Sequence, residues 1–170
     1  AKRRRDGEDG PPFVAIDLIR EHRLGAVRLP VEEGGAGYTL RELFTLLIRL
    51  AEADPDVPHI IRIHLGFVEE RRRTPDRVSG EFWLDKVRDG LLIGGANSEL
   101  TSRAVGVYTY DTTLTPDGDG YRLDGTKFYS TGSLFSDYLR VSANDSEGKQ
   151  VSAVVPAHRE GIEHVNDWDG

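Results

Sequence analysis

The chain contains 170 residues, of which 38% are hydrophobic and 30% are charged, and its formal net charge at pH 7 is −7. The acidic balance argues against a nucleic-acid partner, because a phosphate backbone binds to basic surfaces. The absence of cysteine excludes disulfides, cysteine metal sites and thiolate catalysis, and it favours a cytoplasmic protein. No run of about 18 apolar residues is present, so we expect no membrane span.

The first half of the chain has the pattern of a helical protein. Residues 1–10 combine basic residues, acidic residues and glycine, so we predict a flexible tail. Residues 11–90 are predicted to form an N-terminal helical domain, because apolar residues recur there at helical spacing between helix-start signals. The predicted helices cover residues 13–23, 39–53, 58–72 and 74–88.

Two of these helices carry further information. Thr39 and Glu42 form a capping-box pattern, in which the hydroxyl and the carboxylate bond to backbone amides of the first turn. The helix over residues 58–72 has apolar residues around most of its circumference. Such a helix packs between neighbours, so we place it at the centre of the helical domain.

After Gly90 the hydrophobic period shortens, and residues 91–170 are predicted to form a separate domain of antiparallel strands, either a sheet or a β-barrel. The fold class is therefore α+β, with helices first and strands second. We expect alternating strand residues over 105–110, a hairpin with its reversal at Asp124-Gly125, and a last strand over 161–165. A further hairpin is predicted from residues 138–141 and 151–155.

The segment after the predicted reversal is suited to a ligand. Tyr129, Ser130, Thr131 and Gly132 place an aromatic ring beside small hydrogen-bonding groups and a glycine. This combination can hold a planar heteroaromatic molecule. The alternative is an exposed hairpin with a polar strand end, and composition alone does not decide between the two.

Two motifs resemble the acyl-CoA dehydrogenase superfamily. GYRLDGTKFYST, residues 120–131, is similar to the family's G-Y-x-L-N-G-x-K-x-W-I-T/S stretch, with Tyr129 in the place of tryptophan and Thr131 in the place of the hydroxyl. LPVEEGGAG, residues 29–37, is similar to its L-P-x-x-x-G-G-x-G loop. The resemblance implies a helical first domain and a β-barrel middle domain whose edge contacts a flavin, either FMN or FAD. The C-terminal helical bundle of that family is absent from this chain, and the lack of any methionine also predicts a portion of a longer protein.

The resemblance also implies which other residues contact the flavin. Asn97 and Ser98 lie in a segment similar to the family's T-E-P-x-A-G-S-D entry to the first strand, with Glu99 matching the family's glutamate. Short amide and hydroxyl groups can bond to the flavin edge without burying charge. Their alternative role is to cap the strand entry. Residues 100–103 depart from the family's longer continuation, which weakens the prediction of an acyl-CoA pocket.

His64 is the one ionisable residue of the buried third helix that we expect to reach a ligand, where it could act as a general base or bond to a reactive oxygen species. The alternative is a packed histidine that bonds to a backbone carbonyl. The remaining histidines have no second ligand at metal spacing, so no metal site is predicted.

The motifs look closer to the flavin-dependent monooxygenases of the superfamily, those of the dibenzothiophene-desulfurising type, than to true dehydrogenases. This resemblance implies reduced flavin from a separate reductase, O2, a small apolar or sulfur- or nitrogen-containing substrate, and a homo-oligomer, either a dimer or a tetramer. One alternative is an FAD-dependent acyl-CoA dehydrogenase. The other is a noncatalytic or incomplete flavin-binding module.

Overall fold

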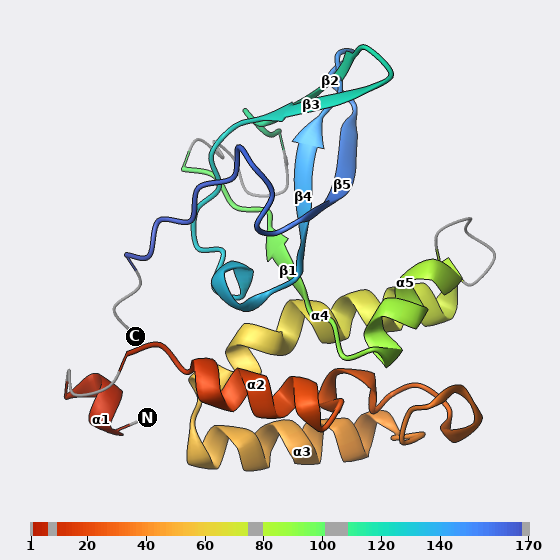
Figure 1. The fold of residues 1–170 in the computed structure, drawn as a ribbon, viewed down its shortest axis with the longest axis vertical. Helices are drawn as coiled ribbons and strands as arrows, with labels where there is room; N and C mark the ends of the chain where they lie inside the picture. The colour runs from red at the N-terminus through yellow and green to blue at the C-terminus, as the bar shows by residue number, and fades with distance from the viewer. Residues whose placement is uncertain (1, 7–9, 75–79, 101–108, 168–170) are drawn as a thin grey trace.

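The computed structural model describes residues 2–6, 10–74, 80–100 and 109–167. Helices form one layer and a β-sheet stands on it, with α4 between the other long helices and the sheet (Figure 1). The elements of the helical layer are α1 (Lys2–Arg5), α2 (Phe13–Glu21), α3 (Leu40–Ala53), α4 (Asp56–Arg73) and α5 (Gly80–Arg88), with short 3₁₀ turns at Leu24–Ala26 and Val31–Glu33. None of the helices among the described residues has the length and apolar character that a bilayer crossing requires.

The predicted helices of the first half are present, with one correction at a boundary. The capping box at the start of α3 is formed, since Glu42 N–H donates to Thr39 Oγ1 and Thr39 N–H donates to the Glu42 carboxylate. Thr74 does not start the next helix. Its hydroxyl donates to the carbonyl of Glu70 and it closes α4, while residues 75–79 lie outside the described part of the chain.

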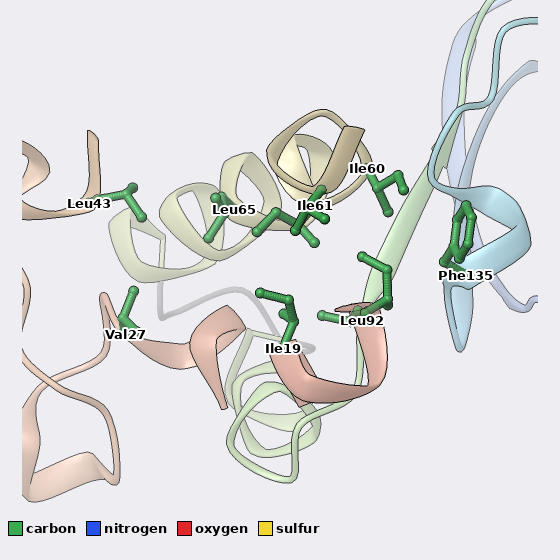
Figure 2. Packing of buried hydrophobic residues seen from close by; sticks show 10 residues of the cluster. Ile19, Val27, Leu43, Ile60, Ile61, Leu65, Leu92 and Phe135 are labelled. Carbon is green, nitrogen blue, oxygen red and sulfur yellow. The ribbon is translucent and has the colours of Figure 1, made fainter. Parts of the chain in front are cut away.

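An apolar cluster lies at the centre of the helical layer, and residues from the middle of α4 form a large part of it. Figure 2 shows Ile60, Ile61 and Leu65 of α4 facing Ile19 of α2 and the residues that surround it. The cluster also reaches Phe135 and Leu92, which lie beside the sheet. The expectation that this helix packs between neighbours is therefore confirmed, and the same residues join the helical layer to the sheet.

The sheet is mixed and open, which corrects the prediction of an antiparallel barrel. Its strands are β1 (Ile93–Ala96), β2 (Thr113–Asp117), β3 (Gly120–Asp124), β4 (Tyr138–Asn144) and β5 (Gln150–Pro156), with a 3₁₀ turn at Ser133–Phe135. The strand β4 pairs in parallel with β1 and antiparallel with β5, and it meets β2 in parallel at a single residue pair. The parallel β1–β4 pair exists because Asp137, just before β4, fixes Leu92 through its carboxylate at 2.7 Å.

The two hairpin predictions have different outcomes. The hairpin of β4 and β5 is confirmed. The reversal predicted at Asp124-Gly125 is wrong, because β3 pairs with β2 through a turn at residues 118–119. At Gly125 the φ angle is +152°, and a Cβ there would lie 2.7 Å from the Cα of Thr112, so the glycine lets the chain cross that residue and leave the sheet.

The chain end also differs from the prediction. Residues 161–165 form no strand, because the His164 ring bonds to the carbonyl of Ala157 and draws the segment back on the end of β5. The predicted alternating strand over residues 105–110 lies largely outside the described residues.

Candidate functional site

A hollow of about 50 Å³ lies where α4 meets the end of β1 and the segment that follows β3. Five of the six cofactor residues predicted from the sequence line it. These are Asn97, Ser98, Tyr129, Thr131 and Gly132. We call this space the ring hollow, because its lining matches the group predicted to hold a planar ring.

The ring hollow exists because two distant segments pair at its rim. The backbone N–H of Phe128 donates to the carbonyl of Ser98 at 2.9 Å, and the two residues form an isolated antiparallel bridge. This bridge places Ser98 beside Tyr129, although 31 positions separate them in the sequence. The segment that was expected to form a hairpin strand thus pairs with the exit of β1.

A buried ion pair holds the same two segments. Glu99 and Lys127 meet at 2.6 Å, and their side chains are 3% and 8% exposed. Burial opposes ionisation of Glu99, but the ammonium of Lys127, the hydroxyl of Thr112 and two backbone amides lower its pKa to about 2. Glu99 is therefore a carboxylate at neutral pH, and it fixes the strand exit and the Tyr129 segment relative to each other.

Tyr129 has an unusual conformation at the rim. Its φ angle is +57°, in the left-handed region, and its side chain is 81% exposed. A non-glycine residue in this region costs of order 1 kcal/mol, and such strain clusters at functional sites. An aromatic ring held out beside a hollow offers a flat apolar surface to a bound molecule.

The neighbouring hydroxyls add polar groups to the rim. The Ser130 Oγ atom is buried and has no hydrogen-bond partner among the described residues. Ser130 does not line the ring hollow itself, unlike the residues on either side of it. Thr131 Oγ1 lies 3.5 Å from the Nε2 atom of His59, which faces the hollow from α4.

Gly132 lines the hollow for a packing reason. A Cβ on Gly132 would lie 2.6 Å from the carbonyl oxygen of Ile60, so any side chain would push this segment away from α4. The close approach brings Thr131 to α4. Gly132 therefore shapes the hollow through backbone packing.

The amide of Asn97 is oriented by a residue that the sequence reasoning missed. Ser142 on β4 donates its hydroxyl to Asn97 Oδ1 at 2.7 Å. The carbonyl oxygen of this amide is then engaged, and its NH2 group is left to donate to a ligand. The period-2 alternation of β4 could have identified Ser142, because Leu139, Val141 and Ala143 are buried and the residues between them face the other side.

His64 lies outside the hollow. Its Nδ1 atom accepts the N–H of Ile93 and its Nε2 atom lies 3.1 Å from the carbonyl of Gly25, so the ring carries its proton on Nε2 and is neutral. Burial lowers its pKa to about 4, against the opposing hydrogen bond to Gly25. The structure does not bring this histidine to the predicted flavin residues, and both of its nitrogens are occupied by backbone groups.

A second, larger hollow of about 420 Å³ adjoins the first. The two share Arg62, Ile63 and Asn97. The second hollow extends along α4 to Gly66 and across to Arg140 of β4. We call it the arginine hollow. Among the described residues no cluster of side chains could hold a metal ion.

Known proteins similar to this chain include flavin-dependent monooxygenases and a putative acyl-CoA dehydrogenase of Bacillus subtilis. No family model matches it. It is 28% identical over 178 residues to a dibenzothiophene monooxygenase of Rhodococcus erythropolis, which covers 96% of this chain and 40% of that protein. It is 26% identical over 169 residues to the protein named "Probable FMNH2-dependent monooxygenase SfnC" of Pseudomonas putida, which covers 97% of this chain and 40% of that protein.

Solved structures give the same result. FMN-bound TdsC from Paenibacillus sp. A11-2 matches with a TM-score of 0.78 and 27% identity over 98% of this chain and 42% of that one. Methanesulfinate monooxygenase MsuC from Pseudomonas fluorescens matches with a TM-score of 0.76 and 26% identity over 96% of this chain and 41% of that one. The chain spans about 40% of the length of the curated relatives it matches. The resemblance to the acyl-CoA dehydrogenase superfamily, on the side of its flavin-dependent monooxygenases, is confirmed.

Proposed function

We propose that this chain is the helical and sheet portion of a two-component flavin-dependent monooxygenase, which uses FMN and O2 to oxidise a small apolar or sulfur- or nitrogen-containing molecule. The observation that carries this proposal is the ring hollow, where Asn97, Ser98 and Thr131 surround an exposed and strained Tyr129. Reduced flavin, when bound there, supplies the electrons that activate O2 for transfer of one oxygen atom.

The residues of the ring hollow fit a flavin ring. The face of Tyr129 would hold a flat tricyclic system, and the hydroxyls of Ser98 and Thr131 and the NH2 group of Asn97 would serve the nitrogen and oxygen atoms at its edge. No carboxylate of the described residues lines this hollow, so an electron-rich ring meets no repulsion there. Ser130 is not among the lining residues, and its buried hydroxyl has no hydrogen-bond partner among the described residues.

His64 has a positioning role in this proposal. It bonds to the first residue of β1, the strand that carries Gly95 to the ring hollow and leads to Asn97 and Ser98. The histidine that faces the bound molecules is His59, which lies five positions earlier on α4. A proton-transfer role at this site is therefore assigned to His59 Nε2 and the adjacent Thr131 hydroxyl.

The identity of the flavin, the partner and the assembly are inferred from the similar proteins. FMN is favoured over FAD, because the similar proteins named above include one that is FMNH2-dependent and one that is FMN-bound. A separate flavin reductase is the expected partner. A cytoplasmic homo-oligomer, either a dimer or a tetramer, is the expected assembly of the whole protein.

Isotope labelling tests the reaction type. The intact protein is mixed with FMN, a flavin reductase, NADH and dibenzothiophene or methanesulfinate under ¹⁸O₂. We expect one ¹⁸O atom in each product molecule and no product without the reductase. An FAD-dependent acyl-CoA dehydrogenase gives the opposite pattern, in which an acyl-CoA bleaches the bound flavin without oxygen. That result, or product oxygen derived from water, contradicts the proposal.

Substitutions test the location of the flavin. Thr131→Val and Tyr129→Ala are each expected to weaken FMN binding about tenfold, in line with the loss of one hydrogen bond or one stacked ring. Thr115→Val on β2 is the matched control, since it removes the same hydroxyl far from the hollow. Binding is measured by the quenching of FMN fluorescence. Equal affinities in Thr131→Val and Thr115→Val would place the flavin elsewhere.

A further inference from the structure

The arginine hollow has a cationic lining. Its polar residues from α4 and β4 are Arg62, Arg140 and Ser142, and Asn97 joins them at the border with the ring hollow. No aspartate or glutamate of the described residues lines it. A hollow of this kind favours an anion over a neutral molecule.

Of the two arginines that line this hollow, Arg62 is the one without a partner among the described residues. Its side chain is exposed, and it makes no hydrogen bond or ion pair with any described residue. The other arginine of the hollow, Arg140, bonds to Glu70 at 2.6 Å and to the hydroxyl of Ser152 at 3.2 Å. Glu70 is shared further with Arg71. One carboxylate thus serves two arginines, and Arg62 adds a third positive charge.

Gly66 keeps the arginine hollow open. It lies in the interior of α4, where glycine is less stable than alanine by about 1 kcal/mol. A Cβ at this position would meet no atom within 4 Å, so packing gives no reason for a glycine. The glycines of the ring hollow differ, because a Cβ on Gly132 or Gly95 would collide with α4. The space above Gly66 is therefore available to a ligand.

We propose that the arginine hollow is an oxyanion subsite, in which Arg62 and Arg140 bind a carboxylate, sulfinate, sulfonate or phosphate group of a molecule whose other end reaches the ring hollow. Guanidinium groups suit these planar or tetrahedral oxyanions because they donate two parallel hydrogen bonds. The hollow shares Asn97 and Ile63 with the ring hollow, so an anionic head group there places the rest of a small molecule beside the flavin. This inference rests on the proposed function and adds a charge requirement to its substrate.

A matched pair of probes tests the charge requirement. Benzenesulfonate and methyl phenyl sulfone have nearly the same shape, and only the first is an anion. Binding of each to the intact protein is measured by calorimetry. We expect Arg62→Gln to weaken benzenesulfonate binding at least about tenfold and to leave the affinity for the sulfone within twofold. Arg62→Lys is expected to lose less affinity than Arg62→Gln, because lysine keeps the positive charge but cannot donate two parallel hydrogen bonds.

The control variant is Arg41→Gln on α3. It removes the same charge from an exposed position outside both hollows, so neither affinity should change. If Arg62→Gln weakens both probes equally, or neither, the oxyanion subsite is overturned. The FMN-binding and ¹⁸O₂ experiments do not depend on this outcome, so they test the proposed function separately.

The oxyanion has two possible sources, the substrate and the phosphate of FMN. Riboflavin lacks that phosphate, so the ratio of the FMN and riboflavin affinities isolates it. If the substrate supplies the anion, this ratio is the same in the wild-type protein and in Arg62→Gln. If the ratio collapses in Arg62→Gln while benzenesulfonate binding is unchanged, the subsite holds the flavin phosphate and the substrate requirement is overturned.

Gly66→Leu separates a binding role from a structural one. The added side chain fills open space and improves helix propensity, so we expect the melting temperature to rise. The same side chain occupies the hollow, and both probes should bind at least about tenfold more weakly. A more stable protein with unchanged binding of both probes would contradict the location of the subsite.

Discussion

The helical layer and the rim of the ring hollow are held together by different forces. The helical layer is joined by apolar side chains such as Ile61, Leu65 and Leu43, which meet in one buried cluster. The rim is joined by polar pairs, among which the Glu99–Lys127 ion pair and the Ser142–Asn97 hydrogen bond connect segments 28 and 45 residues apart. Apolar packing tolerates many exchanges of similar volume, whereas a buried polar pair fails when either member is removed.

Substitutions in the two regions should therefore have different effects on function. A loss in the helical layer lowers the population of folded protein and leaves each folded molecule able to bind. A loss at the rim changes the shape of the site in molecules that remain folded. Measurements of stability and of FMN affinity on the same variants therefore distinguish the two regions.

The largest effect is expected from Glu99→Gln. It leaves the buried Lys127 ammonium without its counter-charge, and breaking a buried ion pair in this way costs about 3–5 kcal/mol. Urea unfolding measures this loss. The same variant should weaken FMN binding at temperatures where it is still folded, because Ser98 and Tyr129 are no longer held at a fixed separation.

The double variant Glu99→Gln/Lys127→Met is the control. It removes both charges from the buried site, so it should recover part of the stability that Glu99→Gln loses. If Glu99→Gln unfolds at the same urea concentration as the wild-type protein, the ion pair does not hold the rim of the ring hollow.

Ile61→Ala is the matching change in the helical layer. Ile61 is 3% exposed at the centre of the cluster in Figure 2, and truncation of such a side chain costs about 3 kcal/mol through lost burial and the cavity left behind. The FMN dissociation constant of the folded fraction should stay within twofold of the wild-type value. A change beyond tenfold would show that the helical core also shapes the flavin site.

Acid should destabilise the protein over two pH ranges, one set by His64 and a lower one set by Glu99. His64 has its pKa lowered by burial to about 4, partly offset by Gly25 and the Asp137 carboxylate, while Arg20 acts in the same direction as burial. The unfolded state, with the ordinary value of 6.5, binds more protons between these limits. Stability is therefore complete above pH 6.5 and falls by about 3 kcal/mol as the pH drops to 4. Glu99, whose pKa is lowered to about 2, adds a further loss below pH 4.5.

Urea midpoints measured from pH 7.5 to 4.0 test the upper range. In His64→Gln the imidazole is replaced by a neutral amide that can still donate to the Gly25 carbonyl, so the slope over this range should flatten. His59→Gln is the control, since this histidine is exposed and its substitution should leave the slope in place. An equal slope in His64→Gln would assign the acid sensitivity to other groups.

Sequence reasoning succeeded where the signal was local. The helix starts and the apolar stripes have fixed spacing, so α3 and α4 were predicted almost to their ends. The segments containing Asn97, Ser98 and Tyr129 were found because each matches a motif along the chain. The resemblance implied that both segments contact one flavin, and the hydrogen bonds of Phe128 and Lys127 show that the segments lie side by side.

Sequence reasoning failed where contacts between residues far apart in the sequence decide the structure. The mixed sheet arises because Asp137 ties β4 to the start of β1, and no local pattern encodes a parallel pair. The places of His59, Arg62 and Gly66 in the two hollows were missed, because they depend on which side of α4 meets the sheet. His64 drew attention through its position in an apolar helix, and the structure buries its ring with both nitrogens at backbone groups.

The smallest effect is expected from Thr39→Ala at the start of α3. The Thr39 hydroxyl accepts the N–H of Glu42, and the loss of such a cap lowers stability by about 1 kcal/mol. The backbone N–H and the hydroxyl of Thr39 also lower the pKa of the Glu42 carboxyl, so an NMR titration should show that pKa rising in the variant. Thr45→Ala is the control, since Thr45 bonds to a helical carbonyl and caps nothing. FMN affinity should be unchanged in both variants, because α3 belongs to the layer that supports the site without lining it; weaker binding in Thr39→Ala alone would extend the rim to this helix.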